Sequence, residues 1–293
     1  MIVETRGLAK RYGAHPALAG VDLAVPEGAV YGLVGPNGAG KTTLLAVLAG
    51  LRRPTSGEVR LAPPRRRVAL LPDTPQFEPW LTGREVVALA RRLVAPGLPV
   101  SREERVLADA ELSAAAERRV GGYSRGMLQR LGLAATVVGE PELLLLDEPA
   151  SALDPAGRRE VLDLIAGLRG KATVVLSSHI LADVQEVCDT VGILREGRLL
   201  FQGSLPDLLV GRAVPAYLVR LRPPLGRVAG VLRAEDWVTG VDILDDQRLR
   251  VTVRSLAEAE QRLPGALAAG DARVVSLGPQ AADLEDVFLE LTS

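Results

Sequence analysis

The stretch Gly35–Thr43 has the sequence GPNGAGKTT, and its residue types are suited to holding phosphate groups. It begins with the pattern G-x-x-x-x-G-K-[ST], in which glycines let backbone N–H groups turn inward around phosphates at the start of a helix. The ammonium group of Lys41 can reach the outer phosphate oxygens, and Thr42 places a hydroxyl where a phosphate-bound Mg²⁺ needs a ligand. The sequence therefore predicts a nucleotide site formed by Gly35, Pro36, Asn37, Gly38, Ala39, Gly40, Lys41, Thr42 and Thr43.

A second group of side chains suited to chemistry follows the apolar run Leu143–Leu146. A strand that ends in Asp147 directs a carboxylate toward the Mg²⁺ ion, and the adjacent Glu148 can polarise an attacking water molecule. Taken alone, an apolar run followed by two acidic residues is better explained as an ordinary strand end. Combined with the upstream loop, the pair predicts a site that hydrolyses a nucleotide.

The elements that must position these residues have the pattern of an α/β protein. Val30–Val34 is predicted to be a buried strand that leads into the loop, and Thr42–Leu51 a helix that Gly50 ends. Apolar runs and helical periodicity predict further strands at Val68–Leu71, Leu143–Leu146, Thr173–Leu176 and Val191–Leu194, and helices at Pro155–Leu168 and Ile180–Cys188. Glu196–Gly197 suits the tight turn of a closing hairpin.

Two regions differ from this alternation. From about Leu81 to Val120, charged residues mix with Leu and Ala at helical spacing, which predicts an inserted helical subdomain at about residues 76–134 of a first domain, residues 1–212. The pattern then restarts, and residues 216–293 are predicted to form a small accessory α+β domain without a chemical motif of its own. Its expected elements are strands at Tyr217–Leu221 and Arg273–Leu277, helices at Gly226–Leu232 and Leu256–Leu263, and a hairpin around Asp245–Asp246.

Other short motifs resemble those of the ABC transporter ATPase family and occur in the family's order. Tyr123–Met127, followed by Gln129 and Arg130, resembles the signature sequence that precedes the Asp-Glu strand. Ser151–Asp154 resembles the loop that couples two nucleotide sites, and Ser177–His179 resembles the segment that carries the switch histidine. The resemblance covers residues 2 to about 210.

This resemblance implies a P-loop NTPase fold, an ABC-ATPase core with an antiparallel β subdomain and an inserted helical subdomain. It also implies that two subunits enclose two ATP molecules, with Ser124 and Gly126 contacting the γ-phosphate bound to the opposite subunit. His179 would contact the γ-phosphate and, with Lys41, stabilise the charge of the transferring phosphoryl group; a satisfied core histidine is the alternative. Tyr12, in the segment KRYG, would stack on adenine, and a half-buried strand tyrosine is the alternative.

One departure from the family concerns the metal. The family usually has Gln after the strand that corresponds to Val68–Leu71, whereas this sequence has Asp73, and Gln76 follows three residues later. We expect Asp73 to join Thr42 and Asp147 around Mg²⁺, because a carboxylate binds this cation more strongly than an amide does. The alternative is that Gln76 takes this place after a shift of the loop.

A second departure lies in the signature, where Tyr123, Arg125 and Met127 replace the usual Leu, Gly and Gln. Arg125 would either add positive charge near the phosphate or point to solvent. The basic residue here, together with the runs Leu81–Glu85 and Leu284–Leu289, resembles the ABC-2 type, or multidrug, exporter ATPases.

The exporter resemblance implies a partner, a membrane permease on a separate chain that docks near Pro75–Glu85. Phe77, Trp80 and Leu81 would suit such a docking groove, and the core of the helical subdomain is an equal alternative. The nucleotide sandwich would be a homodimer, or a heterodimer with a second ABC subunit, located in the cytoplasm at the inner face of the cell membrane. The accessory domain would serve as a regulator, a dimerisation aid or a spacer.

The composition limits other functions. The 293 residues include 35 Lys and Arg against 36 Asp and Glu, which argues against a mainly electrostatic nucleic-acid binder. One cysteine, Cys188, excludes an intrachain disulfide, favours an intracellular location and, with only two histidines, nearly excludes a Cys/His zinc site. Cys188 is expected to serve in helix packing and His15 to be a surface residue. No segment approaches the roughly 18 consecutive apolar residues that mark a membrane span.

Two competing classes remain. A soluble ABC ATPase that acts on nucleic acid or ribosomes is disfavoured because the chain has a single cassette and no sustained heptads. A P-loop kinase or regulator that transfers the phosphoryl group to a substrate is disfavoured by the segment Tyr123–Arg130.

Overall fold

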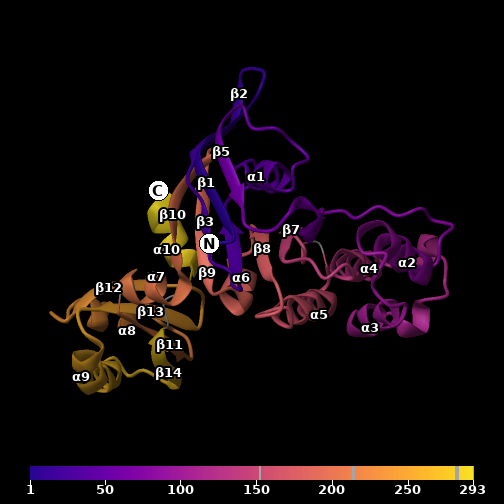
Figure 1. The fold of residues 1–293 in the computed structure, drawn as a ribbon. Helices are drawn as coiled ribbons and strands as arrows, with labels where there is room; N and C mark the ends of the chain where they lie inside the picture. The colour runs from indigo at the N-terminus through magenta and orange to yellow at the C-terminus, as the bar shows by residue number, and fades with distance from the viewer. Residues whose placement is uncertain (152, 213–214, 281–283, 293) are drawn as a thin grey trace. The chain divides into compact units, whose positions relative to one another are not determined.

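The computed structural model describes residues 1–151, 153–212, 215–280 and 284–292 (Figure 1). These residues divide into two compact units, one of residues 1–207 together with the segment from Phe288 onward, the other of residues 208–287. The division falls inside α7 (Leu205–Arg212) and again inside α10 (Leu284–Thr292). No helix among the described residues is both long enough and apolar enough to cross a bilayer.

A six-stranded sheet forms the centre of the first unit, in the order β10-β9-β4-β8-β7-β6. Its strands are β4 (Val30–Val34), β6 (Val68–Leu71), β7 (Leu143–Asp147), β8 (Thr173–Ser178), β9 (Thr190–Arg195) and β10 (Arg198–Ser204). All pairs are parallel except β9 with β10, which form the predicted hairpin through Glu196–Gly197. Because β4, β7 and β8 are buried along their whole length, they appear in the sequence as continuous apolar runs, and the strands predicted there are confirmed.

An antiparallel sheet lies beside the central one. It consists of β1 (Val3–Tyr12), β2 (His15–Val21), β3 (Ala24–Val25) and β5 (Ser56–Leu61). Helix α1 (Lys41–Leu48) shares one hydrophobic core with both sheets, since Leu44 and Leu48 cluster with Leu8 of β1 and Leu145 of β7. The helix that leaves the phosphate loop is therefore fixed on two sides.

Three helices form a subdomain with a core of its own. These are α2 (Gly83–Val94), α3 (Ser101–Asp109) and α4 (Arg125–Val137), and they lie together away from the antiparallel sheet (Figure 1). Val87, Leu107 and Leu131, one from each helix, are buried in this core. Helix α2 begins with a capping box in which Thr82 and Glu85 satisfy each other's backbone N–H groups.

Two further helices cover the central sheet. Helix α5 (Pro155–Ala166) begins at Asp154, whose side chain accepts a hydrogen bond from Gly157 N, and α6 (Leu181–Val187) follows His179 and Ile180. Cys188 comes directly after α6 and is buried, as predicted. Burial raises the pKa of its thiol, so this cysteine is protonated and unreactive at neutral pH.

The second unit has the strand and helix order β-α-β-β-α-β. Its elements are β11 (Ala216–Leu221), α8 (Gly226–Arg233), β12 (Val238–Ile243), β13 (Arg248–Val253), α9 (Leu256–Ala269) and β14 (Val274–Gln280). The four strands form one antiparallel sheet in the order β12-β13-β11-β14, with β11 and β13 at the centre. This is the arrangement of a ferredoxin-like split βαβ domain, whose core is built around Trp237, Val219 and Leu263.

Helix α9 corrects one prediction. The sequence places the end of this helix at Leu263, before Pro264, but α9 continues to Ala269. Leu263, Ala266 and Leu267 are all buried, so the apolar face of the helix runs past the proline. Pro264 itself is exposed, and solvent can bond the backbone carbonyl that the ring leaves without a partner. Packing therefore outweighs the local helix-breaking tendency of proline.

Candidate functional site

The predicted site residues meet at one edge of the central sheet. Strands β4, β8, β7 and β6 are neighbours and parallel, so their carboxyl ends lie side by side. The phosphate loop follows β4, His179 follows β8, Asp147 and Glu148 stand at the end of β7, and Asp73 follows β6. In open α/β sheets this edge is where ligands bind.

The loop needs glycine at two positions in particular. Gly38 and Gly40 have φ angles of +82° and +108°, which side chains rarely tolerate. A Cβ atom on Gly40 would also lie 2.5 Å from the carbonyl oxygen of Ala17. Gly40 precedes the first turn of α1, and no side chain caps that helix, so its first N–H groups remain available to an anion.

Lys41 is held at the centre of this loop. Its side chain is buried, and its Nζ donates a hydrogen bond of 2.7 Å to the carbonyl oxygen of Gly35. The same Nζ lies 3.2 Å from Oε1 of Glu148. The ammonium group is thus already directed into the space that the loop encloses.

Glu148 links Lys41 to His179. Its second carboxylate oxygen, Oε2, lies 2.8 Å from Nδ1 of His179 and accepts a hydrogen bond of 3.4 Å from the backbone N–H of the same residue. Glu148 has a φ of +47°, an uncommon conformation for a residue with a long side chain. Glu148 therefore contacts both of the other residues predicted to be catalytic, although the three are far apart in the sequence.

A pocket of about 390 Å³ opens at this loop. Its lining comprises Tyr12, His15, Ala17, Pro36, Asn37, Gly38, Ala39, Gly40, Lys41, Thr42, Thr43, Asp73 and Glu148. The volume is within the range of pockets that bind small molecules. It joins the predicted adenine-stacking residue, the phosphate loop and two carboxylates in one space.

His15 is a pocket residue that sequence reasoning missed. It is exposed, as predicted, but it pairs with Tyr12 across the β1–β2 hairpin and lines the pocket beside it. The Nζ of Lys10 lies 5.0 Å from the centre of the Tyr12 ring, within cation–π distance. Hairpin pairing across a short turn is the signal that could have placed His15 here.

The structure brings Asp73, and not Gln76, to the pocket. Asp73 lines it, and its Oδ1 accepts a hydrogen bond of 2.8 Å from Oγ of Ser151. Gln76 is exposed and does not line the pocket. Asp147 is buried at the end of β7 and does not itself line the pocket.

The signature residues lie elsewhere, at the start of α4. Ser124 caps this helix, since its Oγ accepts a hydrogen bond of 3.3 Å from Met127 N. Neither Ser124 nor Gly126 lines the pocket of the same chain. Tyr123 replaces the usual leucine by packing into the subdomain core, where its hydroxyl donates a hydrogen bond of 2.6 Å to the carbonyl oxygen of Ala115. Arg125 is exposed and pairs with no other described residue.

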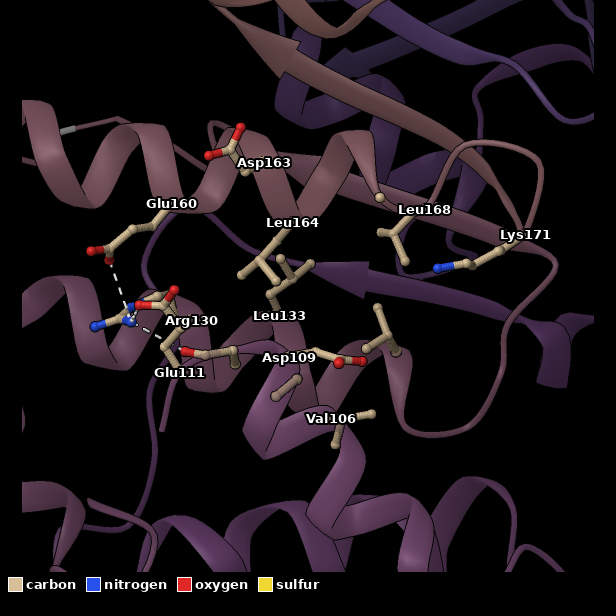
Figure 2. A pocket seen from close by; sticks show the side chains of 14 residues that line it. Val106, Asp109, Glu111, Arg130, Leu133, Glu160, Asp163, Leu164, Leu168 and Lys171 are labelled. Atoms are coloured by element: carbon tan, nitrogen blue, oxygen red, sulfur yellow. Dashed lines mark hydrogen bonds and ion pairs between the residues drawn. The ribbon is translucent and has the colours of Figure 1, made fainter. Parts of the chain in front are cut away.

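A second hollow, of about 370 Å³, lies between α3, α4 and α5 (Figure 2). Leu133, Leu164 and Leu168 form its apolar wall, and Arg130 of α4 pairs with Glu160 of α5 at 3.3 Å. None of the predicted site residues lines this hollow. This hollow is therefore a gap between the packed helices of the helical subdomain and α5, and it is not the reaction site.

The loop after β4, the acidic pair after β7 and the parallel sheet define the class of the protein, a P-loop nucleotide-hydrolysing enzyme. The comparisons with known proteins narrow this class, because the ABC transporter family profile matches residues 18–151. The chain is 34% identical over 296 residues to the ABC transporter ATP-binding protein YxlF of Bacillus subtilis, covering 99% of both chains. The chain belongs to the ABC transporter ATP-binding proteins, and it is an ATPase subunit.

Two relatives have more specific names. One is similar over nearly all of this chain and the other over about seven tenths of it. The daunorubicin resistance ATP-binding protein DrrA3 of Streptomyces coeruleorubidus is 35% identical over 301 residues, with 98% of this chain and 94% of the relative covered. The bacitracin transport ATP-binding protein BcrA of Enterococcus faecalis is 36% identical over 218 residues, with 71% and 70% covered.

Solved structures of ATP-binding cassettes are similar over about seven tenths of the chain. The structure of an ATP-binding subunit of an ABC transporter is 30% identical with a TM-score of 0.65, covering 72% of this chain and 93% of that one. A dimeric post-hydrolysis state of an ATP-binding cassette bound to ADP and Pi is 25% identical with a TM-score of 0.64, covering 69% and 98%. These likenesses confirm the expected fold class, the α/β P-loop core of an ABC ATPase.

Proposed function

We propose that this chain hydrolyses ATP in a head-to-tail dimer and thereby drives export through a membrane permease on a separate chain. The observation that carries the proposal is the position of Glu148, whose two carboxylate oxygens contact Lys41 at 3.2 Å and His179 at 2.8 Å beside the phosphate loop. A carboxylate between a phosphate-binding ammonium group and a histidine is suited to orient a water molecule against the outermost phosphate.

The residues of the site have distinct roles in this proposal. Tyr12 stacks on the adenine ring, and backbone N–H groups of Gly35–Thr43 bind the phosphates. Lys41 leaves Glu148 and pairs with phosphate oxygens, which frees the carboxylate to accept a proton from the attacking water. His179 and Lys41 then stabilise the charge of the transferring phosphoryl group.

The donor set also fits a magnesium ion. Thr42, Asp73 and Asp147 offer one hydroxyl and two carboxylates, the oxygen ligands that Mg²⁺ prefers. No cluster of three or more His, Cys, Asp or Glu side chains that could hold a metal occurs among the described residues. This suits a Mg²⁺ ion that takes only some of its ligands from the protein and the others from substrate phosphates and water. When bound, it would neutralise phosphate charge.

The position of the signature residues supports the proposed dimer. Ser124 and Gly126 stand at the start of α4, outside the pocket of their own chain, and an added Cβ on Gly126 would meet no atom nearer than 3.9 Å. This open helix start would face the γ-phosphate held by a second subunit, either an identical copy or a second ABC subunit. The similar cassette described above was solved as a dimer with ADP and Pi.

Export and membrane attachment rest on the relatives and on one exposed side chain. DrrA3 and BcrA carry names that refer to daunorubicin resistance and bacitracin transport, so we assign an export role and a place at the cytoplasmic face of the membrane. In the segment proposed to meet the permease, Phe77 and Leu81 pack on the core of the helical subdomain, whereas Trp80 is 63% exposed. The near-neutral charge makes nucleic acid an unsuitable partner.

The test is the Glu148→Gln variant of the full-length chain with ATP and Mg²⁺. We expect turnover to fall by roughly a hundredfold or more, because the amide cannot accept the proton of the water molecule. ATP should still bind, and dimers should accumulate on gel filtration. The control is Glu142→Gln at the other end of β7, where Glu142 pairs with Arg67 on the surface. Normal turnover of Glu148→Gln without dimer accumulation would refute the assignment.

A further inference from the structure

Ser177 of β8 lies directly beside Asp147 of β7. The two residues are partners in the parallel pairing of these strands, so their side chains leave the sheet on the same face. Ser177 has no exposed surface, and Asp147 is 5% exposed. The serine is therefore buried at the edge of the sheet where the acidic pair begins.

The hydroxyl of Ser177 uses both of its hydrogen-bonding functions on this pair. It donates its proton to Oδ1 of Asp147 at 2.7 Å. Its oxygen accepts a hydrogen bond of 2.9 Å from the backbone N–H of Glu148. Since a hydroxyl has one proton and two lone pairs, a single side chain binds two consecutive acidic residues in a defined direction.

The second of these bonds acts where the backbone is unusual. Glu148 has a φ of +47°, and this left-handed turn sends its side chain away from Asp147, toward Lys41 and His179. The N–H of Glu148 is the amide that immediately precedes this turn. A fixed acceptor at that amide limits the rotation of the peptide from which the Glu148 side chain departs.

We infer that Ser177 is a positioning residue for ATP hydrolysis, because its hydroxyl sets the direction of both the Asp147 carboxylate and the Glu148 backbone. The inference rests on the roles proposed above for these two acidic residues. It concerns a buried residue that does not line the nucleotide pocket. Its effect reaches the reaction through its two neighbours alone.

Water cannot easily replace this hydroxyl. Replacement of Ser177 by alanine removes one oxygen atom from a fully buried position, and the space left is smaller than a water molecule requires. Oδ1 of Asp147 and the N–H of Glu148 would then lose their common partner. Unpaired buried polar groups reorient to find new partners, which here means that both acidic residues change direction.

The experiment measures steady-state ATP hydrolysis by the full-length Ser177→Ala variant as a function of ATP and Mg²⁺. We expect kcat to fall roughly ten- to a hundredfold, while KM for ATP changes by less than about threefold. The Mg²⁺ concentration at half-maximal rate should rise, because Asp147 is no longer held. Ser177→Cys, which keeps the size but is a weak hydrogen-bond donor, should resemble Ser177→Ala, and Ser177→Thr, which keeps the hydroxyl, should restore kcat.

The matched control is Thr173→Val on the same strand. Thr173 is also buried in β8, and its hydroxyl accepts a hydrogen bond of 2.9 Å from the backbone N–H of Gly28, at the end of β8 away from the site. Both variants lose one buried hydroxyl, so both should melt at a lower temperature. Only Ser177→Ala and Ser177→Cys should have a lower kcat.

Two outcomes separate this inference from the proposed function. If Ser177→Ala keeps the kcat and Mg²⁺ dependence of Thr173→Val while Glu148→Gln is inactive, Ser177 has a structural role only and the inference is overturned. If Glu148→Gln retains full turnover, the proposed role of Glu148 is wrong. The raised Mg²⁺ requirement of Ser177→Ala would in that case still report the contact with Asp147.

Discussion

Ser151 Oγ donates a hydrogen bond of 2.8 Å to Oδ1 of Asp73. This bond joins the loop after β6 to the loop after β7, which leads through Asp154 into α5. Asp73 also lines the nucleotide pocket. Asp73 is therefore held by Ser151, which lies in the segment that resembles the family's loop between two nucleotide sites.

Asp73→Asn tests the metal role of this aspartate. Asparagine keeps an oxygen that can accept the bond from Ser151 but removes the negative charge, so we expect weaker Mg²⁺ binding and an intact loop. The Mg²⁺ concentration at half-maximal ATP hydrolysis should rise by roughly three- to tenfold. Gln76→Ala serves as the control and should have no effect. A shift in Gln76→Ala alone would instead assign the metal to Gln76.

The two histidines should separate catalysis from binding. His179 contacts Glu148, whereas His15 lines the pocket beside Tyr12. We expect His179→Ala to lower kcat by about a hundredfold with little change in nucleotide affinity, because it removes a group that acts on the transferring phosphoryl group. His15→Ala should weaken nucleotide binding by a fewfold and leave kcat unchanged. Equilibrium binding of ATP and single-turnover hydrolysis measure the two effects separately, and an exchange of the two phenotypes would contradict the assignment.

The stability of the helical subdomain should depend on the capping box of α2. Thr82→Ala removes the side-chain acceptor of Glu85 N and should lower the free energy of unfolding by about 1 kcal/mol. Thr82→Ser keeps the hydroxyl and should lose much less. Urea denaturation of the full-length variants measures the difference. Equal losses in both variants would mean that the cap does not stabilise the protein.

Much of the site is predictable from the sequence because its main residues directly follow the segments that position them. The glycines of the phosphate loop and the apolar strand before Asp147 must adjoin in sequence the residues that they position, so Lys41 and Glu148 are recognisable without a structure. The hydroxyl of Ser177 acts on residues about thirty positions away. Only the register of β7 with β8 brings them together. His15 was missed for a different reason, because its pairing with Tyr12 across the short β1–β2 turn is local but was not predicted.

In the second unit, too, the contacts between segments far apart in the sequence could not be predicted. Most of its strands and helices are visible as apolar patterns, but their spatial order, β12-β13-β11-β14, is set by long-range pairing that no local pattern encodes. At Pro264 the local sequence pattern gives a wrong prediction. A strong local signal predicts a helix end, and the buried Ala266 and Leu267 beyond it continue the helix instead.

Trp80 should determine whether this chain binds its permease. It is 63% exposed, while its neighbours Phe77 and Leu81 pack on the subdomain core, so the side chain offers a large apolar surface that nothing in the folded subdomain requires. Buried aromatic anchors commonly carry much of the binding free energy of an interface.

We expect Trp80→Ser to weaken association with the permease by at least about tenfold, with ATP binding by the isolated chain unchanged. The measurement is co-purification of the permease with this chain in detergent after the two are expressed together. Leu93→Ser is the matched control, because Leu93 is 74% exposed on α2 of the same subdomain but lies outside the predicted docking segment. Equal recovery of the permease with both variants would show that Trp80 is not the anchor.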